Sequence, residues 1–134
     1  MIVVDANVLL YSYFPSEHKL IIDKLFLEDP NWIAPSLWRS EFRNVTAKFV
    51  KQGLPFETAL EIIDLAEQFM AGNDVTVSSK EVMMLANQSG CTAYDCEYVS
   101  VALARTVPLI TFDQDVLKKF PGIAYGVEEF LGNR

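Results

Sequence analysis

Short apolar runs, each followed by a longer segment of helical character, restrict the fold of this chain more than any other feature. The runs are rich in β-branched residues and span 2–4, 32–34, 74–77, 108–111 and, more weakly, 123–125. Strands of this length separated by helical patterns are typical of βαβ units. The sequence therefore predicts an α/β fold with a short, mostly parallel central sheet.

The clearest helical pattern lies in the middle of the chain. Its first half, 36–52, carries one apolar stripe at spacings of four, three and four: Trp38, Phe42, Val45 and Phe49. The segment 53–55 (Gly-Leu-Pro) ends this helix, and a second stripe runs from Ala59 to Met70 before Gly72. We therefore expect a helical hairpin over 36–71.

Two sequences of capping-box type mark further helix starts. They are Ser78 with Glu81, before a helix over 79–89, and Thr92 with Asp95, before a helix over 93–106. The second of these helices is apolar nearly all round, which favours a central position. A last short helix is expected after Asp113.

Length and composition indicate one ordinary domain. No repeat or linker divides the 134 residues, so we expect a single domain over 1–134. An apolar fraction of 51% excludes a disordered protein, and no apolar run approaches the ~18 residues of a membrane span. The opening segment has no basic leader, so we expect a soluble, cytoplasmic protein. Cys91 and Cys96, five residues apart, are expected to be buried free thiols.

The net charge of −7 argues against a general nucleic-acid binder, because such affinity comes largely from basic side chains that meet phosphates. Two features could offset it. The eleven Lys and Arg residues could cluster locally, or a metal ion could neutralise an acidic site.

Several acidic residues occupy equivalent places in the expected fold. Asp5 and Asp113 follow two of the strands directly, and Asp95 opens the most buried helix. Ligands of open parallel sheets bind beyond the carboxyl ends of strands, where the strand order reverses. Glu41 falls about 60° from the centre of the apolar stripe of its helix, at the border of the buried face.

Each acid also has an ordinary structural explanation. Asp is a common N-cap and gains from the helix dipole in a first turn, and Glu41 could be a solvated surface acid. Carboxylates that meet in one cleft would, however, repel one another and raise each other's pKa unless a cation lay among them. Oxygen-only ligands favour Mg²⁺ or Mn²⁺ over zinc.

Other catalytic arrangements are absent from the sequence. His18 is the only histidine, lies in a polar helix start far from the acidic motifs, and is expected to be a surface residue. It forms no Ser-His-Asp or Cys-His combination, and no glycine-rich phosphate loop is present. Hydrolysis at the acids would therefore depend on a metal-activated water.

Four segments resemble the motifs of PIN domains, in order and across nearly the whole chain. The first, 4–10, has an acid followed two residues later by Asn7, and the second, 40–45, carries Glu41. The third and most distinctive, 94–104, begins Tyr-Asp, and the fourth, 109–113, ends in Thr-Phe-Asp. Cys96 departs from the small Ala that is usual in the third motif.

The length resembles the VapC-type toxins of prokaryotic toxin–antitoxin pairs. That resemblance implies a three-layer α/β/α sandwich, Mg²⁺-dependent RNA cleavage, a homodimer and inhibition by a small antitoxin protein. It also implies roles for particular residues. Asp5 and Asp95 would be metal ligands, Asp113 a further ligand, Glu41 the acid that completes the cluster, and Asn7 and Thr111 polar supports. Asp115 could share or take over the role of Asp113.

The sequence leaves other functions open. A PIN-type nuclease could instead act in RNA maturation or on structured DNA, without an antitoxin. A signalling receiver would need an Asp after its third strand and a Lys after its fifth, and neither is present here. A non-catalytic binding module would be expected to lack one of the acids, and none is missing.

Overall fold

The computed structural model describes residues 1–132 and contains one five-stranded sheet. The strands are β1 (Ile2–Val4), β2 (Trp32–Pro35), β3 (Asp74–Val75), β4 (Leu109–Ile110) and β5 (Ala124–Tyr125). Their order is β3-β2-β1-β4-β5, and all four pairings between neighbours are parallel. The prediction of an α/β fold with a short parallel sheet is confirmed.

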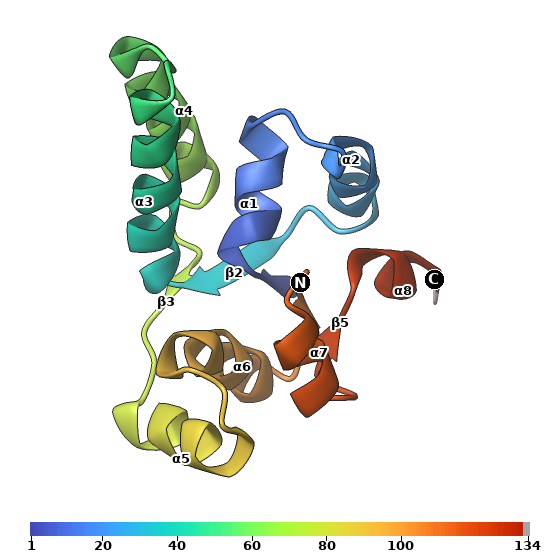
Figure 1. Cartoon of the computed structure of the whole chain (residues 1–134). Helices are drawn as coiled ribbons and strands as arrows, with labels where there is room; N and C mark the ends of the chain where they lie inside the picture. Colours follow the sequence, from blue (N-terminus) through green and yellow to red (C-terminus); the bar gives the residue numbers. More distant parts are fainter. Residues whose placement is uncertain (133–134) are drawn as a thin grey trace.

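Helices cover both faces of the sheet (Figure 1). They are α1 (Ala6–Tyr13), α2 (Lys19–Glu28), α3 (Leu37–Lys51), α4 (Phe56–Phe69), α5 (Ser79–Ser89), α6 (Ala93–Arg105), α7 (Gln114–Lys119) and α8 (Val127–Gly132). In Figure 1, α1, α2 and the α3–α4 hairpin lie above the sheet, whereas α5 and α6 lie below it. This is the expected three-layer sandwich.

The core lies between the sheet and these two helical layers. Every residue of β1 is fully buried, as expected for a central strand covered on both faces. Helix α6 packs against β1, β2 and β4, and α5 packs on α6 from outside. The predicted central position of α6 is confirmed, although Leu103 on that helix is exposed. Cys91 and Cys96 are buried free thiols, as expected.

The strand order reverses between β1 and β4. From β1 the chain builds β2 and β3 on one side, then crosses to add β4 and β5 on the other. In the register of β1 and β4, Val4 lies opposite Ile110. The next residues, Asp5 and Thr111, therefore leave the sheet side by side at its carboxyl edge.

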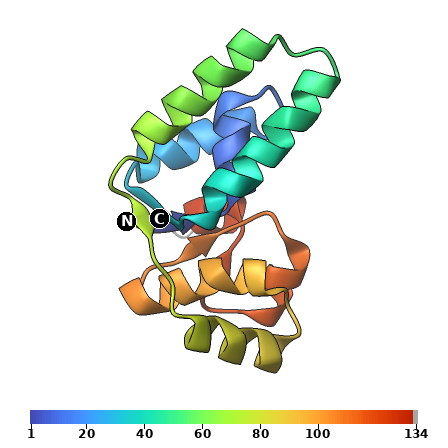
Figure 2. The ribbon, with the colours of Figure 1, turned by 90° about the vertical axis from the view of Figure 1, so that its left-hand side faces the viewer.

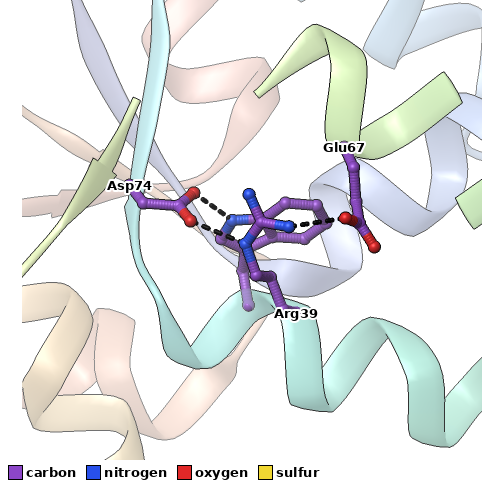
Figure 3. Close-up of polar contacts among 4 residues, drawn as sticks. Arg39, Glu67 and Asp74 are labelled. Atoms are coloured by element: carbon purple, nitrogen blue, oxygen red, sulfur yellow. Dashed lines mark hydrogen bonds and ion pairs between the residues drawn. The ribbon is translucent and has the colours of Figure 1, made fainter. Parts of the chain in front are cut away.

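The predicted hairpin forms as α3 and α4, which extend away from the sheet (Figure 2). A polar cluster fixes its base (Figure 3). Arg39 Nε donates to Asp74 Oδ2 at 2.6 Å, Arg39 Nη1 donates to Glu67 Oε2 at 2.7 Å, and Trp38 Nε1 donates to Asp74 Oδ1 at 2.7 Å. The guanidinium also lies over the Trp38 ring. This clamp of four residues joins the start of α3 to α4 and β3.

Some details differ from the sequence-based expectations. The third and fourth strands are shorter than predicted, 74–75 and 109–110, because pairing ends where the chain turns into the following loops. Within the part of the chain that the structure describes, no helix is long and apolar enough to cross a membrane. The single-domain extent, 1–134, stays a prediction, and its last two residues lie outside the described ones.

Candidate functional site

Asp5 lies at the carboxyl end of β1, where α1 begins. Although it occupies the N-cap position, its side chain makes no capping hydrogen bond. It instead accepts a hydrogen bond from Thr111 Oγ1 at 2.6 Å, across the junction between β1 and β4. Capping alone, the explanation that the sequence left open, therefore does not account for this carboxylate, although the amides of Ala6 and Asn7 lie near enough to lower its pKa.

The buried hydroxyl of Thr111 links two acidic residues. While it donates to Asp5, it accepts a hydrogen bond from the backbone N–H of Asp113 at 3.0 Å. Asp113 also serves as the N-cap of α7, because its Oδ1 accepts from the N–H of Val116 at 3.0 Å. Thr111 thus links Asp5 to Asp113, its role as a polar support stays a prediction, and Asp113 is both a cap and a neighbour of Asp5.

Asp95 is carried by the first turn of α6. Thr92 caps this helix by accepting from the N–H of Asp95 at 3.0 Å, as the capping-box pattern predicted. This bond occupies the backbone of Asp95, and its half-buried carboxyl group lies among the other acids. Burial raises the pKa of Asp95, and the charges of Asp113 and Asp5 raise it further, whereas a hydrogen bond with Thr92 lowers it.

Glu41 comes from the second turn of α3 and meets α6. Its Oε1 accepts a hydrogen bond of 2.6 Å from the hydroxyl of Tyr98. Burial raises the pKa of Glu41, the bond from Tyr98 lowers it, and the charges of Asp5 and Asp95 raise it again. The helical-wheel argument, which set Glu41 at the border of the buried face, agrees with this half-buried position.

The pKa values of Asp5, Glu41 and Asp95 are all raised, which indicates that these acids lie in one site. Burial raises the pKa of Asp5 too; the hydrogen bond from Thr111 and the nearby amides of α1 lower it, and the charge of Asp113 raises it. Each of Asp5, Glu41 and Asp95 therefore carries the electrostatic effect of at least one other acid of the set. The structure brings Asp5, Glu41, Asp95 and Asp113 together at the carboxyl edge of the sheet.

Tyr98 is a part of this site that sequence reasoning did not identify. It is buried, and it lies three residues after Asp95 on the same helix. Burial, followed by the charge and hydrogen bond of Glu41, raises the pKa of Tyr98 far above its ordinary value, so the hydroxyl keeps its proton and donates. A tyrosine one turn after an acid, on a helix expected to be buried, was the available signal.

The two remaining candidates lie at the margin. The exposed Asp115 accepts a hydrogen bond from Cys91 Sγ at 3.6 Å, and its charge adds to the raised pKa of Asp95. Because only Asp113 is joined to Asp5 through Thr111, the geometry favours Asp113 for the fourth acidic position. Asn7 is exposed in the first turn of α1, and its supporting role stays a prediction.

The donor chemistry of the site fits a hard cation. Its side chains offer only oxygen atoms, mostly from carboxylates, which are the ligands that Mg²⁺ and Mn²⁺ prefer. Among residues 1–132, no three His, Cys, Asp or Glu side chains are already close enough to hold an ion. A cation would therefore have to draw the carboxylates inward, and in doing so it would relieve their mutual repulsion.

The protein is an α/β/α sandwich whose acidic residues lie where the strand order of its parallel sheet reverses. This combination defines a class of domains with an acidic site at the carboxyl edge of the sheet. Residues 2–123 match the sequence model of the PIN domain, and the chain belongs to the PIN domain family. Members of this family are typically nucleases that depend on a metal ion. No curated protein matches the chain.

Two solved structures share the fold. One is PAE2754 from Pyrobaculum aerophilum, with a TM-score of 0.72 and 24% sequence identity, covering 98% of this chain and 94% of that one. The other is FitAcB from Neisseria gonorrhoeae, with a TM-score of 0.72 and 13% identity, covering 96% of this chain and 99% of that one. The similarity of fold extends over nearly the full length of both proteins.

Proposed function

We propose that this protein is a Mg²⁺-dependent endoribonuclease and acts as the toxin of a toxin–antitoxin pair. One observation carries the nuclease part of the proposal. Thr111 joins Asp5 to Asp113 by two hydrogen bonds, and Glu41 and Asp95, from two further elements, lie near enough for the charge of Asp5 to raise the pKa of each. Structural caps on unrelated helices would have no need to converge.

Asp5, Asp95 and Asp113 would hold Mg²⁺, or Mn²⁺ in its place, with Glu41 completing the cluster. The cation, when bound, would supply charge neutralisation at a phosphodiester and activate water for its hydrolysis. Thr111 keeps Asp5 turned toward Asp113 through its hydroxyl. Tyr98 occupies Oε1 of Glu41, so the other oxygen of that carboxylate can face the site.

The toxin part of the proposal draws on the resemblance to VapC-type proteins and on the surface of the hairpin. Phe56, Leu60 and Leu65 of α4 are exposed, although Trp38, Phe42 and Met70 pack inside. An amphipathic antitoxin segment could cover such a face, and a basic side chain of that segment would be attracted to the acids nearby. A homodimer and a cytoplasmic location, where RNA is available, belong to the same proposal.

The experiment replaces Asp5 by Asn, which preserves its size and removes one charge. We expect a folded Asp5→Asn protein that no longer cleaves RNA in Mg²⁺ and no longer inhibits growth when it is expressed. Asp64→Asn is the matched control, because Asp64 is exposed on α4 and accepts only from Gln68 in the next turn.

Full activity of folded Asp5→Asn would refute the mechanism. Metal-dependent RNA cleavage by the parent without any growth inhibition would instead favour a PIN-type nuclease that works without an antitoxin.

A further inference from the structure

An acidic nuclease needs a source of RNA affinity other than phosphate contacts. With a net charge of −7, this protein has few basic side chains to offer a polyanion, and some are already paired. Lys19 binds Asp23 and Arg39 binds Asp74 and Glu67. Single-stranded nucleic acid is also held by stacking of its bases on aromatic side chains, and this contribution does not depend on protein charge.

Three aromatic rings gather beside the acidic site. The ring centroids of His18 and Phe112 are 4.6 Å apart, those of Tyr11 and His18 are 4.7 Å apart, and those of Tyr11 and Phe112 are 5.3 Å apart. All three residues are half-buried, and His18 and Phe112 line a pocket at the surface. The expectation that His18 is a plain surface residue far from the acidic motifs is wrong in this respect, because it contacts Phe112 of the fourth motif.

A pocket of about 250 Å³ opens next to these rings. It lies between the start of α2, the segment after β4 and the start of α8, and its walls include His18, Ile21, Phe112, Leu117 and Val127. Two of these walls, His18 and Phe112, are planar rings on which a flat heterocyclic ring can stack, and the aliphatic walls can cover its other face.

The pocket and the acidic site share one buried residue, Thr111. Thr111 lines the pocket, and its hydroxyl donates to Asp5. Phe112 stands between Thr111 and Asp113 in the chain. A nucleotide whose phosphate lay at the acids would therefore have its base within reach of the pocket.

The acidic side chains at the rim of the pocket favour a nucleobase over a phosphate group as the bound group. Glu128 and Glu129 line the opening from α8, and both are exposed. Carboxylates repel a phosphate group but accept hydrogen bonds from the N–H groups on the edge of a base. Gln114 adds an amide that can donate or accept at the same rim.

We propose that this pocket binds one nucleobase of the RNA substrate, next to the phosphodiester that is cleaved, by stacking against His18 and Phe112. The proposal rests on the proposed nuclease function and adds a substrate-positioning site to it. Stacking of one base contributes about 1–3 kcal/mol, which corresponds to about 5–150-fold in affinity.

The test combines a protein variant with an altered RNA. Phe112→Leu keeps an apolar side chain and removes the aromatic face. A defined RNA oligonucleotide is prepared intact and with a single abasic nucleotide at each position around the cleavage site, and kcat/KM is measured for each. Phe26→Leu is the matched control, because Phe26 is also a partly exposed aromatic residue, but it packs on Trp32 and Phe69 instead.

We expect Phe112→Leu to lower kcat/KM for the intact RNA by about 5–150-fold, and Phe26→Leu to leave it unchanged. With the parent, one abasic position should produce a similar loss. On that abasic RNA, Phe112→Leu should cause no further loss, because the base it would contact is already missing. His18→Leu should reproduce this pattern, in case Phe112→Leu is too unstable to measure.

Independent, additive losses from the variant and the abasic position would overturn the proposal, as would the absence of any sensitive position. If the parent cleaves no RNA, the proposed function fails. In that case, fluorescence anisotropy measures the binding of the same oligonucleotides in EDTA. This tests whether the pocket binds a base without any need for cleavage. A loss of binding in Phe112→Leu that disappears with one abasic RNA supports the pocket, and equal binding by all variants overturns it.

Discussion

At the scale of single residues, the site depends on neutral hydroxyl groups that orient charged ones. Thr111 donates a hydrogen bond of 2.6 Å to Asp5, and Tyr98 donates one of 2.6 Å to Glu41. A hydrogen bond to an ionised acceptor is stronger than one between neutral groups, and it restricts the rotation of the carboxylate. These two side chains therefore decide which oxygen atoms of Asp5 and Glu41 remain available.

Removal of the Tyr98 hydroxyl should loosen Glu41 without emptying the core. We expect Tyr98→Phe to weaken Mn²⁺ binding or RNA cleavage by about 10–100-fold, the usual cost of losing a group that orients a metal-site ligand. Its melting temperature in EDTA should change little, because the ring still fills its place. Mn²⁺ affinity by titration calorimetry is the measurement.

Tyr125→Phe provides the comparison for that variant. Tyr125 donates its hydroxyl to the carbonyl oxygen of Gly122, at an exposed position away from the acids. Equal Mn²⁺ affinity in Tyr98→Phe and Tyr125→Phe would mean that Tyr98 has no orienting role.

The crowded carboxyl groups should also make stability depend on pH. The pKa values of Asp5, Glu41 and Asp95 are raised in the folded protein, mainly by burial, above ordinary values of 3.8 for Asp and 4.5 for Glu. At pH values between the ordinary pKa values and the raised ones, these acids hold more protons in the folded chain than in the unfolded chain. The free energy of unfolding should therefore fall as pH rises through that interval.

Urea unfolding in EDTA at a series of pH values above about 4 tests this dependence. Asp5→Asn should show a shallower decrease than the parent, since it removes one of the buried charges, and Asp64→Asn should match the parent. A parent whose stability rises with pH over the same range would contradict the raised pKa values.

At the scale of elements, the α3–α4 hairpin is joined to the sheet by a charged clamp rather than by apolar contacts alone. Asp74 accepts from both Trp38 and Arg39, and Arg39 also donates to Glu67 (Figure 3). Glu41 follows Arg39 by two residues on α3, so the clamp also fixes the helix turn that carries Glu41.

Loss of the clamp should therefore cost stability. Arg39→Met keeps the side-chain length but leaves Asp74 and Glu67 without their shared donor. We expect the free energy of unfolding to fall by about 1–2 kcal/mol, a value that allows for partial solvent screening of these groups. Urea unfolding measures it, and Arg43→Met, at an exposed position of α3, should stay within about 0.5 kcal/mol of the parent. Equal stability of the two variants would mean that the clamp contributes nothing.

Sequence patterns located the strands and the helices α3 to α7 because their signals are local, but they gave no bounds for α1 and α2 and did not predict α8. The short apolar runs, the stripe from Trp38 to Phe49 and the capping boxes each depend on neighbours in the chain. Strand lengths were less certain, since a strand ends where its partner ends, and partners such as β1 and β4 are far apart in sequence.

The site was only partly predictable for the same reason. Asp5 and Asp113 follow from their places after strands, and Glu41 from its place on a helix border. Thr111 and Asp5, which are hydrogen-bonded, lie 106 positions apart in the sequence, and Tyr98 and Glu41 lie 57 positions apart. The pattern of apolar residues within one helix or strand cannot predict hydrogen bonds between such distant residues. The aromatic cluster around His18 was missed because its members lie on three separate segments.

At the scale of the whole molecule, metal binding and folding should be linked. A cation that binds only the folded state stabilises it, by about 2.7 kcal/mol at 100 times its Kd. We expect millimolar Mn²⁺ to raise the melting temperature by several degrees, at roughly 3 °C per kcal/mol. Asp95→Asn should respond less and Asp64→Asn as fully as the parent. An undiminished response of Asp95→Asn would exclude Asp95 as a ligand.

The position of β4 in the sheet has a consequence for the time at which activity can arise. β1 pairs with β2 on one side and with β4 on the other, and β4 is made about a hundred residues after β1. At about 5–20 residues per second of synthesis, a nascent chain spends seconds with Asp5, Glu41 and Asp95 already made but without Thr111 and Asp113. Until residues 109–113 leave the ribosome, the chain cannot assemble its acidic site. Under the proposed function, the messenger RNA being translated is therefore exposed to no finished nuclease from that chain.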